Sequence, residues 1–526
     1  MKKIFTLSSL LLLVLSLWSQ QANLFTIPNQ SAQFIRMPAR ETAIDVDAVF
    51  FNPANLPSLG NGVFLNINNQ ILNQTSNIQS DYQLYPNGPN DYPGKVRSFI
   101  FPSVFANWNI NKSSFHGGFL IVGGAGGVNY TNLPVSDRGI ADVPAAITNS
   151  DFFSAPSLVN YDAANGTSFS QIADYRFNFI NKGLGFSPGV QLGYAYKLND
   201  YFSFGMDFRW MQQVFSSEGE VSNIEILPNT TDPSLNNWIS PGDYLRLVGA
   251  ETGNTVYTNI AGIYDGLAED RYINIRQKGS GITFIPSVLI NPTKRFFIAL
   301  KYEHKAKVVL TTKVRDGKDG GVQNGRPVFI DGEEIRSDIP GFLSMGLGYQ
   351  FTDKWRVNFG SRYMFIKGAN FNGREANIDK NYYEVEFGTS YQVFNKFLLS
   401  TGYTYNKAGV APQYHNDVDF WIPGHSFAFG GKLDFTKAIS LDMGVMYTKN
   451  VGQNFTYTNH VYADGNALAG QPANYDNSYT MKFTKSSLIF ALGLNIKIRN
   501  SKDKTPNLQE IVEPKNNGDL PYHYRG

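Results

Sequence analysis

Short and long connections alternate strictly between segments in which apolar and polar residues also alternate. One such segment, YFSFGMDFRW, places Phe202, Phe204 and Phe208 on one face and Asp207 and Arg209 on the other. Period-two alternation predicts strands with one apolar and one polar face. The short connections predict hairpins, and they lie at 109–114, 198–200, 291–295, 352–354, 394–396 and 436–438.

The number of the connections, and the side of the sheet on which each lies, indicate whether the apolar faces of the strands meet lipid or a protein core. A first strand at 62–71, six hairpins and a last strand at 485–498 give fourteen strands, an even number, with all short turns on one side. This pattern is typical of a bacterial outer-membrane barrel, whose closure also removes unpaired sheet edges. A soluble multi-domain β-protein would alternate too, but it does not explain the separation of short turns from long loops. We therefore predict an all-β membrane protein, a 14-stranded antiparallel barrel over 62–498, in the Gram-negative outer membrane.

The two ends of the chain lack strand alternation. Residues 1–19 have a basic start and an apolar core shorter than the roughly 20 residues of a membrane-spanning helix, which indicates a signal peptide rather than an anchor. Residues 20–61 mix apolar residues with breakers, and we expect a compact hatch inside the barrel lumen; the alternative is a disordered extension. Residues 499–526 form a polar tail, expected in the periplasm. Two Asn- and Gly-rich stretches, 219–280 and 453–483, are assigned no regular structure.

Composition and motifs give no sign of catalysis. The net charge of +2 provides no broad attraction for nucleic acid, and neither a cofactor nor a metal site is predicted. None of the six histidines lies in a nucleophile motif such as G-x-S-x-G. His415 with Asp417 and Asp419 could bind a metal, but we favour the interpretation that they belong to a solvated loop. The stretch 315–321 lacks the later acidic ligand of a calcium loop.

Residues 43–59, AIDVDAVFFNPANLPSL, resemble the hatch signature of the FadL/TodX family of outer-membrane long-chain fatty-acid and aromatic-hydrocarbon transporters. The resemblance implies a 14-stranded barrel with an N-terminal hatch that takes up lipophilic small molecules. A plainer interpretation is that Asn-Pro only makes a turn and that Asp45 and Asp47 cap a short helix. The matching hatch positions are Asp47, Phe50, Phe51, Asn52, Pro53 and Ala54.

Four glycines interrupt the predicted third strand, where glycine weakens the strand interior: Gly123, Gly124, Gly126 and Gly127. The family resemblance implies a kink there that opens the barrel wall, so that a ligand leaves sideways into outer-membrane lipid. Glycine suits such a break because it tolerates unusual backbone angles. The alternatives are a glycine-lined strand end near the outer rim and a phosphate-binding loop, although no helix follows to bind phosphate.

Charged residues fall on the predicted inner face of the barrel. Arg356 and Arg362 lie on a strand next to the one that carries Glu384 and Glu386, so cross-strand pairing is expected. We favour an internal polar lattice that holds the hatch. The alternative is a clamp for a substrate carboxylate, formed by Arg209, Arg356 or Arg362.

The longest loops, 131–182 and 219–280, contain apolar residues that we interpret as a ligand-capture surface. Loop-to-loop packing over the barrel mouth is the alternative. The capture residues are Phe152, Phe153, Leu158 and Trp238.

The C-terminal end suggests two protein contacts. The last strand, 488–498, resembles the signal that the barrel-insertion machinery reads during biogenesis, and the tail could dock a periplasmic protein. A second functional hypothesis is therefore a carrier or scaffold in protein secretion or assembly. A general porin for hydrophilic solutes is disfavoured by the predicted hatch.

Overall fold

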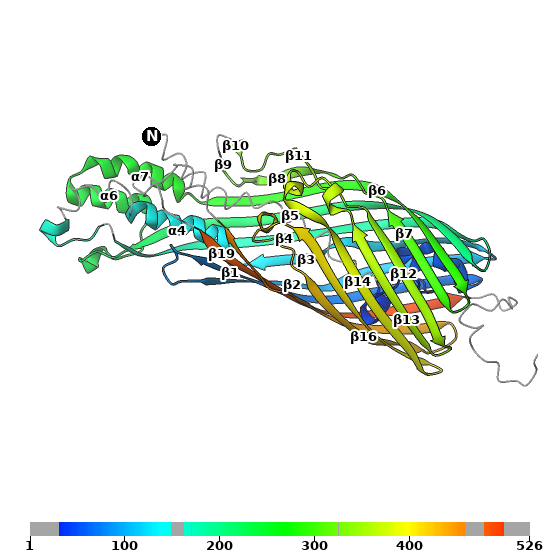
Figure 1. The fold of residues 1–526 in the computed structure, drawn as a ribbon. Coiled ribbons are helices and arrows are strands. Elements are labelled where there is room, and N and C mark those ends of the chain that lie inside the picture. The colour runs from blue at the N-terminus through cyan, green and yellow to red at the C-terminus, as the bar shows by residue number, and fades with distance from the viewer. Residues whose placement is uncertain (1–30, 149–161, 170, 324–325, 458–477, 499–526) are drawn as a thin grey trace, which may run out of the picture.

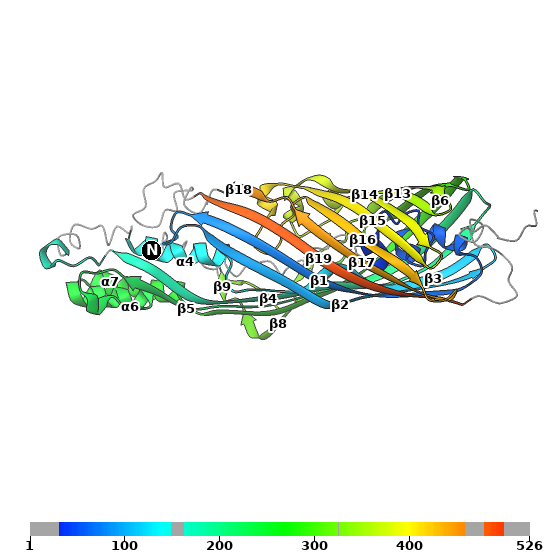
Figure 2. The ribbon, with the colours of Figure 1, turned by 90° about the horizontal axis from the view of Figure 1, so that it is seen from below.

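The structure is a computed structural model that describes residues 31–148, 162–169, 171–323, 326–457 and 478–498. Within these ranges, fourteen antiparallel strands form a closed barrel (Figures 1 and 2). β1 (Gly62–Tyr82) pairs with both β2 (Asn90–Ile110) and β19 (Tyr479–Ile498), which closes the ring. The predicted fold class and strand number are confirmed. The ring continues through β3 (Ser113–Tyr130), β4 (Ile172–Lys197), β5 (Phe202–Pro228), β6 (Arg271–Thr293), β7 (Phe296–Glu303), β12 (Phe342–Thr352), β13 (Trp355–Met364), β14 (Ile378–Phe394), β15 (Phe397–Val410), β16 (Gly424–Asp434) and β17 (Ile439–Asn450).

The short turns join strands at one end of the barrel, where outer-membrane barrels face the periplasm. The six predicted hairpins are all present, with turns at 111–112, 198–201, 294–295, 353–354, 395–396 and 435–438. Three further strands extend the barrel sheet toward the other end: β8 (Val309–Asp319), β11 (Glu334–Arg336) and β18 (Gln453–Tyr457). β9 (Val322–Gln323) and β10 (Arg326–Pro327) pair with each other in a separate two-stranded sheet.

The apolar face of each strand points out of the barrel. On β5, Phe204 and Phe208 are 46% and 60% exposed, whereas Asp207 and Arg209 are fully buried. Water would disfavour so many exposed aromatic rings, but a bilayer stabilises them. The alternation therefore sets which side of the sheet meets lipid.

The long loops are more regular than the sequence indicated. β4 and β5 run for 26 and 27 residues, well beyond the roughly 9–11 that cross a bilayer. Within 219–280, helices α6 (Pro241–Thr252) and α7 (Thr255–Leu267) pack on the strand extensions, so the assignment of no regular structure there is wrong. Ser240 and Asn254 cap the two helices through their side-chain oxygens, and Gly253 between them adopts φ +66°. Tertiary burial and these caps outweigh the breaker-rich composition.

Helices lie at both ends of the barrel (Figure 1). α4 (Pro134–Thr148), α6 and α7 gather at the long-loop end, whereas the hatch elements lie inside the barrel toward the short-turn end. The hatch elements are α2 (Ala32–Arg36), α3 (Ala48–Phe51) and the 3-10 helix η1 (Pro53–Leu59). Among the described residues, no helix has both the length and the apolar character needed to span a bilayer. Four further 3-10 turns are η2 (Pro233–Leu235), η3 (Ile366–Gly368), η4 (Arg374–Asn377) and η5 (Pro412–Tyr414).

Candidate functional site

The Asn52-Pro53-Ala54 turn of the hatch docks against the barrel wall. The Asn52 Nδ2 donates to the carbonyl oxygens of Val288 on β6 (3.2 Å) and Leu300 on β7 (3.4 Å). Its Oδ1 accepts from the Ala54 N–H (3.2 Å) and caps η1, whose first position suits Pro53 because that residue needs no N–H there. One side chain therefore joins the hatch to two strands and starts the next helical turn.

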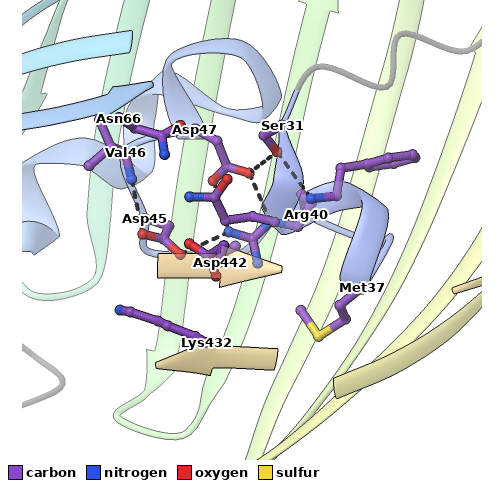
Figure 3. A network of polar contacts seen from close by, with 12 residues as sticks. Ser31, Met37, Arg40, Asp45, Val46, Asp47, Asn66, Lys432 and Asp442 are labelled. Carbon is purple, nitrogen blue, oxygen red and sulfur yellow. Dashed lines mark hydrogen bonds and ion pairs between the residues drawn. The ribbon is translucent and has the colours of Figure 1, made fainter. Parts of the chain in front are cut away.

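Asp47 belongs to a cluster of hydrogen bonds and ion pairs inside the hatch and does not cap a helix (Figure 3). Its carboxylate accepts from Arg40 Nη2 (2.8 Å), Arg40 Nε (3.1 Å) and Ser31 Oγ (2.8 Å). It makes no capping bond to α3. Among the described residues, Asp45 accepts from the N–H of its neighbour Val46 and from Arg40, and neither bond caps a helix, so the capping interpretation is wrong. The reason is local: Asp47 has helical φ and ψ, whereas a capping residue needs extended backbone.

Arg362 on β13 joins the hatch to the barrel through three buried carboxylates. Its guanidinium lies 3.3 Å from Glu41 of the hatch, 3.3 Å from Glu384 and 3.1 Å from Glu386. Glu386 also accepts from the hatch N–H of Ala39 (2.5 Å). Burial, with the nearby Glu386 charge, raises the pKa of Glu41 to about 7. Arg362 thus holds hatch and wall in one ion-pair cluster.

The other two lumenal arginines differ in their partners. Arg209 pairs with Glu303 (2.5 Å) across the wall. Arg356 lies opposite Ser390 in the β13–β14 register and donates to the hatch carbonyl of Thr42 (2.6 Å), so the expected pairing of Arg356 with a glutamate is wrong. The inner charges make the contacts of a lattice around the hatch.

The ladder between β2 and β3 is interrupted. Among the described residues, pairing runs to Val104 with Phe119 and resumes only at Val96 with Val128. Over the same stretch β3 stays paired with β4, with register shifts that skip Val122 and Ala125. The four glycines lie in this segment, and Gly124 has φ +88°, an angle that glycine adopts without strain. Over this stretch, β3 therefore keeps its ladder to β4 but lacks ladder pairing to β2.

β2 also contributes to this break, which the sequence pattern did not predict. Phe99 and Ile100 together oppose the single residue Ile71 of β1, which makes a bulge, and they are 67% and 76% exposed. A signal was present, since Pro102 lies in an otherwise alternating segment and proline in a strand marks an edge or a bulge.

A cavity lies in the lumen between the hatch and the residues that close the barrel mouth. It holds about 1120 Å³ of empty space, including the part that opens to solvent. Phe34 of the hatch and Trp421 of the loop after β15 both line it, and its wall includes Phe101 and Gly124 from the two sides of the break. A bound molecule would therefore touch the interrupted wall. Arg209, Arg356 and Arg362 do not line the cavity.

Lys485 on β19 is the one charged residue among the described residues that line the cavity. Asp419, whose charge acts on Lys485, is itself paired with Arg374 at 2.9 Å. No described carboxylate lies within ion-pair distance of the Lys485 ammonium group. Lys485 was not among the predicted site residues, because nothing in the local sequence distinguishes it from the other lysines.

A family model described as "Outer membrane protein transport protein (OMPP1/FadL/TodX)" matches residues 186–497. The chain belongs to the FadL/TodX family. Its members are outer-membrane transporters for hydrophobic compounds and not enzymes, which also gives the location of this chain as the outer membrane. A comparison with curated protein sequences found no match.

Solved FadL/TodX structures share the fold of the chain. A FadL homologue of Pseudomonas aeruginosa is 13% identical, with a TM-score of 0.56, and the alignment covers 90% of this chain and 98% of that one. The toluene transporter TodX of Pseudomonas putida is also 13% identical, with a TM-score of 0.51 and coverage of 90% and 99%. Identity this low supports the shared architecture, and ligand preference has to be argued from the cavity itself.

The predicted capture loops of this FadL/TodX chain are described only in part. Trp238 is half-buried, and the Arg176 guanidinium lies over its ring, 4.5 Å from the centroid. Trp238 does not line the lumenal cavity. Phe152, Phe153 and Leu158 lie outside the described residues, as do residues 1–19, 20–30 and 499–526. Ligand capture by these loops stays a prediction.

The His415 loop is buried, not solvated, and this corrects the sequence interpretation. His415 is 7% exposed, and its Nδ1 accepts from the Trp421 N–H (3.1 Å). Asp417 accepts from the Val135 N–H (2.6 Å), and Asp419 holds Arg374. Burial lowers the pKa of His415 to about 4. The loop therefore packs as part of the cap over the cavity.

One Ser-His-Asp set comes together in the wall, but its geometry does not support hydrolysis. His116 Nε2 lies 3.0 Å from Asp207, and Ser114 Oγ lies 3.4 Å from His116 Nδ1. The Ser114 hydroxyl donates to Asn107 (2.5 Å), and the residue is fully buried. A nucleophile needs its hydroxyl free for the base and open to substrate. Across the described ranges, no group of three or more His, Cys, Asp or Glu side chains is arranged to hold a metal.

Proposed function

We propose that this FadL/TodX chain takes up hydrophobic small molecules from outside the cell and releases them sideways into the outer membrane between β2 and β3. The observation that carries the proposal is that the lumenal cavity includes Phe101 and Gly124, one from each edge of the interrupted ladder. The hatch, which Arg362 joins to the wall, lies inside the barrel toward the short-turn end, and we infer that it blocks the direct route to the periplasm.

The energetics favour such a route. Each methylene group of a lipophilic solute gains about 0.8 kcal/mol on leaving water. A path from an apolar cavity directly into lipid retains that gain, whereas a water-filled pore would forfeit it. The unpaired backbone of β2 and β3 at membrane depth is tolerated where protein or a cavity covers it.

Lys485 favours a ligand with an anionic head over a pure hydrocarbon. Around it, the cavity combines apolar surfaces such as Ile489 and Phe420 with uncharged polar groups. A half-buried ammonium group without a carboxylate partner lacks the pairing that buried charges normally have. We infer that a long-chain fatty acid places its carboxylate at Lys485 and its chain toward Phe101, and that the extracellular loops capture it first.

The head-group assignment is tested by binding of a long-chain fatty acid and of the fatty alcohol of equal length. We expect Lys485→Met to weaken binding of the acid about 10- to 150-fold, since a hydrogen bond to a charged group contributes about 1.5–3 kcal/mol. Binding of the alcohol should stay unchanged. Lys482→Met, on the same strand at an exposed position, is the matched control. Equal losses for acid and alcohol would contradict the assignment.

The lateral route is tested with a photoactivatable fatty acid in vesicles. Labelling concentrated in 97–103 and 120–127, together with lost uptake in a deletion strain, supports release through the wall. Labelling that runs along the hatch to the periplasmic end would contradict it. If uptake is unchanged in the deletion strain and the purified chain carries a stoichiometric protein partner, the secretion-scaffold hypothesis is favoured instead.

A further inference from the structure

Asn69 is a polar residue on the lipid-facing side of β1, close to the break. It is exposed and alternates with Ile67 and Ile71, whose side chains are 43% and 37% exposed. A carboxamide that faces hydrocarbon has no water to bond, and each unsatisfied polar group there costs several kcal/mol. Such a position normally carries an apolar residue, so the partners of this amide need an explanation.

Both halves of the Asn69 carboxamide bond to the backbone of the β2 bulge. Its Nδ2 donates to the Phe99 carbonyl oxygen (3.1 Å), and its Oδ1 accepts from the Phe101 N–H (3.0 Å). A neighbouring strand would supply one donor and one acceptor in the same way. The side chain therefore replaces the ladder bonds that the bulge removes between Gln70 and Leu72.

The bulge that Asn69 contacts lies within the segment of β2 that does not pair with β3. The β2 ladder to β3 is missing between Val96 and Val104, and the bulge residues lie in the middle of that gap. Ser98 Oγ donates to the Ile100 carbonyl oxygen (3.1 Å), which satisfies another polar group of the bulge from within β2. Three polar groups of the bulge, the carbonyl oxygens of Phe99 and Ile100 and the Phe101 N–H, are thus bonded without any contribution from β3.

We propose that Asn69 is a positioning residue for the opening: its carboxamide fixes the β2 bulge and so keeps that edge of the wall apart from β3. The consequence for transport rests on the proposed function, whereas the effect on β2 does not. Asn69 lies on the outer surface and does not line the lumenal cavity, so it acts on release and not on ligand binding.

The test measures backbone amide exchange, ligand affinity and uptake in the full-length chain. For Asn69→Leu we expect amide exchange within 97–103 to become about tenfold faster, because the Phe101 N–H loses its acceptor. The affinity of the cavity for a long-chain fatty acid should stay unchanged, and uptake should fall. Asn69→Ser is the second variant in case the leucine variant does not fold; its hydroxyl is too short to make both bonds, so exchange should be faster than in the wild type but less so than expected for leucine.

Thr75→Val is the matched control. Thr75 is another exposed polar residue of β1, and it bonds to the Ser486 side chain (3.0 Å) away from the bulge. It should leave exchange in 97–103 unchanged. Exchange in the Asn69 variants that equals the control would overturn the positioning role even if the wild type transports. Altered exchange in a protein whose wild type shows no uptake would instead sink the proposed function and leave the positioning role standing.

Discussion

Replacing Arg362 by methionine tests whether one buried arginine fastens the hatch. The guanidinium contacts three carboxylates, from Glu41, Glu384 and Glu386, at 3.1–3.3 Å, and all four side chains are at most 5% exposed. Removing one member of a buried ion pair costs about 3–5 kcal/mol, because the partner charge is left in a poorly polarisable site. We expect the free energy of hatch attachment to fall by about that amount.

The loss should depend on pH, because the stranded acids can take up protons. The pKa of Glu41 in the folded protein is about 7, above its ordinary value of 4.5, so the folded state binds the extra proton. Stability from such a group is present below pH 4.5 and is lost as pH rises through 7. Without Arg362 the carboxylates hold protons more tightly, so the deficit of the variant should grow as pH rises.

The absence of cysteine from the chain provides a clean assay. A single thiol introduced by Ala43→Cys, at a buried position of the hatch, should react with a maleimide only when the hatch detaches. The extent of labelling as a function of urea concentration therefore gives the free energy of hatch attachment. Arg176→Met is the matched control. Its ion pair with Glu225 (2.6 Å) is exposed and should contribute less than about 1 kcal/mol.

Two outcomes would refute the reasoning about Arg362. One is a shift in the labelling midpoint no larger than that of the control. The other is a deficit that stays constant between pH 5 and 8, since uncompensated buried carboxylates must respond to protons. Glu386→Gln in the Arg362→Met background should recover part of the loss, because it removes one stranded charge.

Three further changes probe the hatch turn, the broken strand and the cap. Asn52→Ala should lower hatch stability by about 1–2 kcal/mol in the same thiol assay, since the cap of η1 and two bonds to the wall are lost; an unchanged midpoint would argue against this anchor. Gly124→Ala should lower local stability by about 1–2 kcal/mol or more, because an L residue is strained at φ +88° and its Cβ would meet the Gly185 carbonyl oxygen. Faster amide exchange at 183–187 would show this loss, and exchange equal to the wild type would exclude it. For His415, whose pKa is lowered to about 4, stability should fall by about 1.4 kcal/mol per pH unit as pH drops from 6.5 to 4, and His415→Gln should flatten this urea-unfolding profile.

The barrel followed from the sequence because its signals are local. Alternation of neighbouring residues fixes which face of a strand meets lipid, and the length of a connection fixes whether two strands form a hairpin. Phe204 beside Gly205 on β5 carries that information without reference to any distant residue. Loop helices such as α6 escaped the same reasoning, since burial against β4 and β5 outweighs their breaker-rich composition.

The site depended on contacts that the sequence does not encode locally. Arg36 reaches Asp442 (2.7 Å) and Ala39 reaches Glu386 across hundreds of residues, and barrel closure alone sets which of them meet. Lys485 carries no local mark of facing a cavity, and the β2 bulge became visible only from its register with β1. Local alternation and loop lengths are enough to specify a fourteen-stranded wall with an apolar exterior. The hatch contacts inside that wall and the break in it are seen only in the folded barrel, because strand register and hatch docking are properties of the closed barrel as a whole.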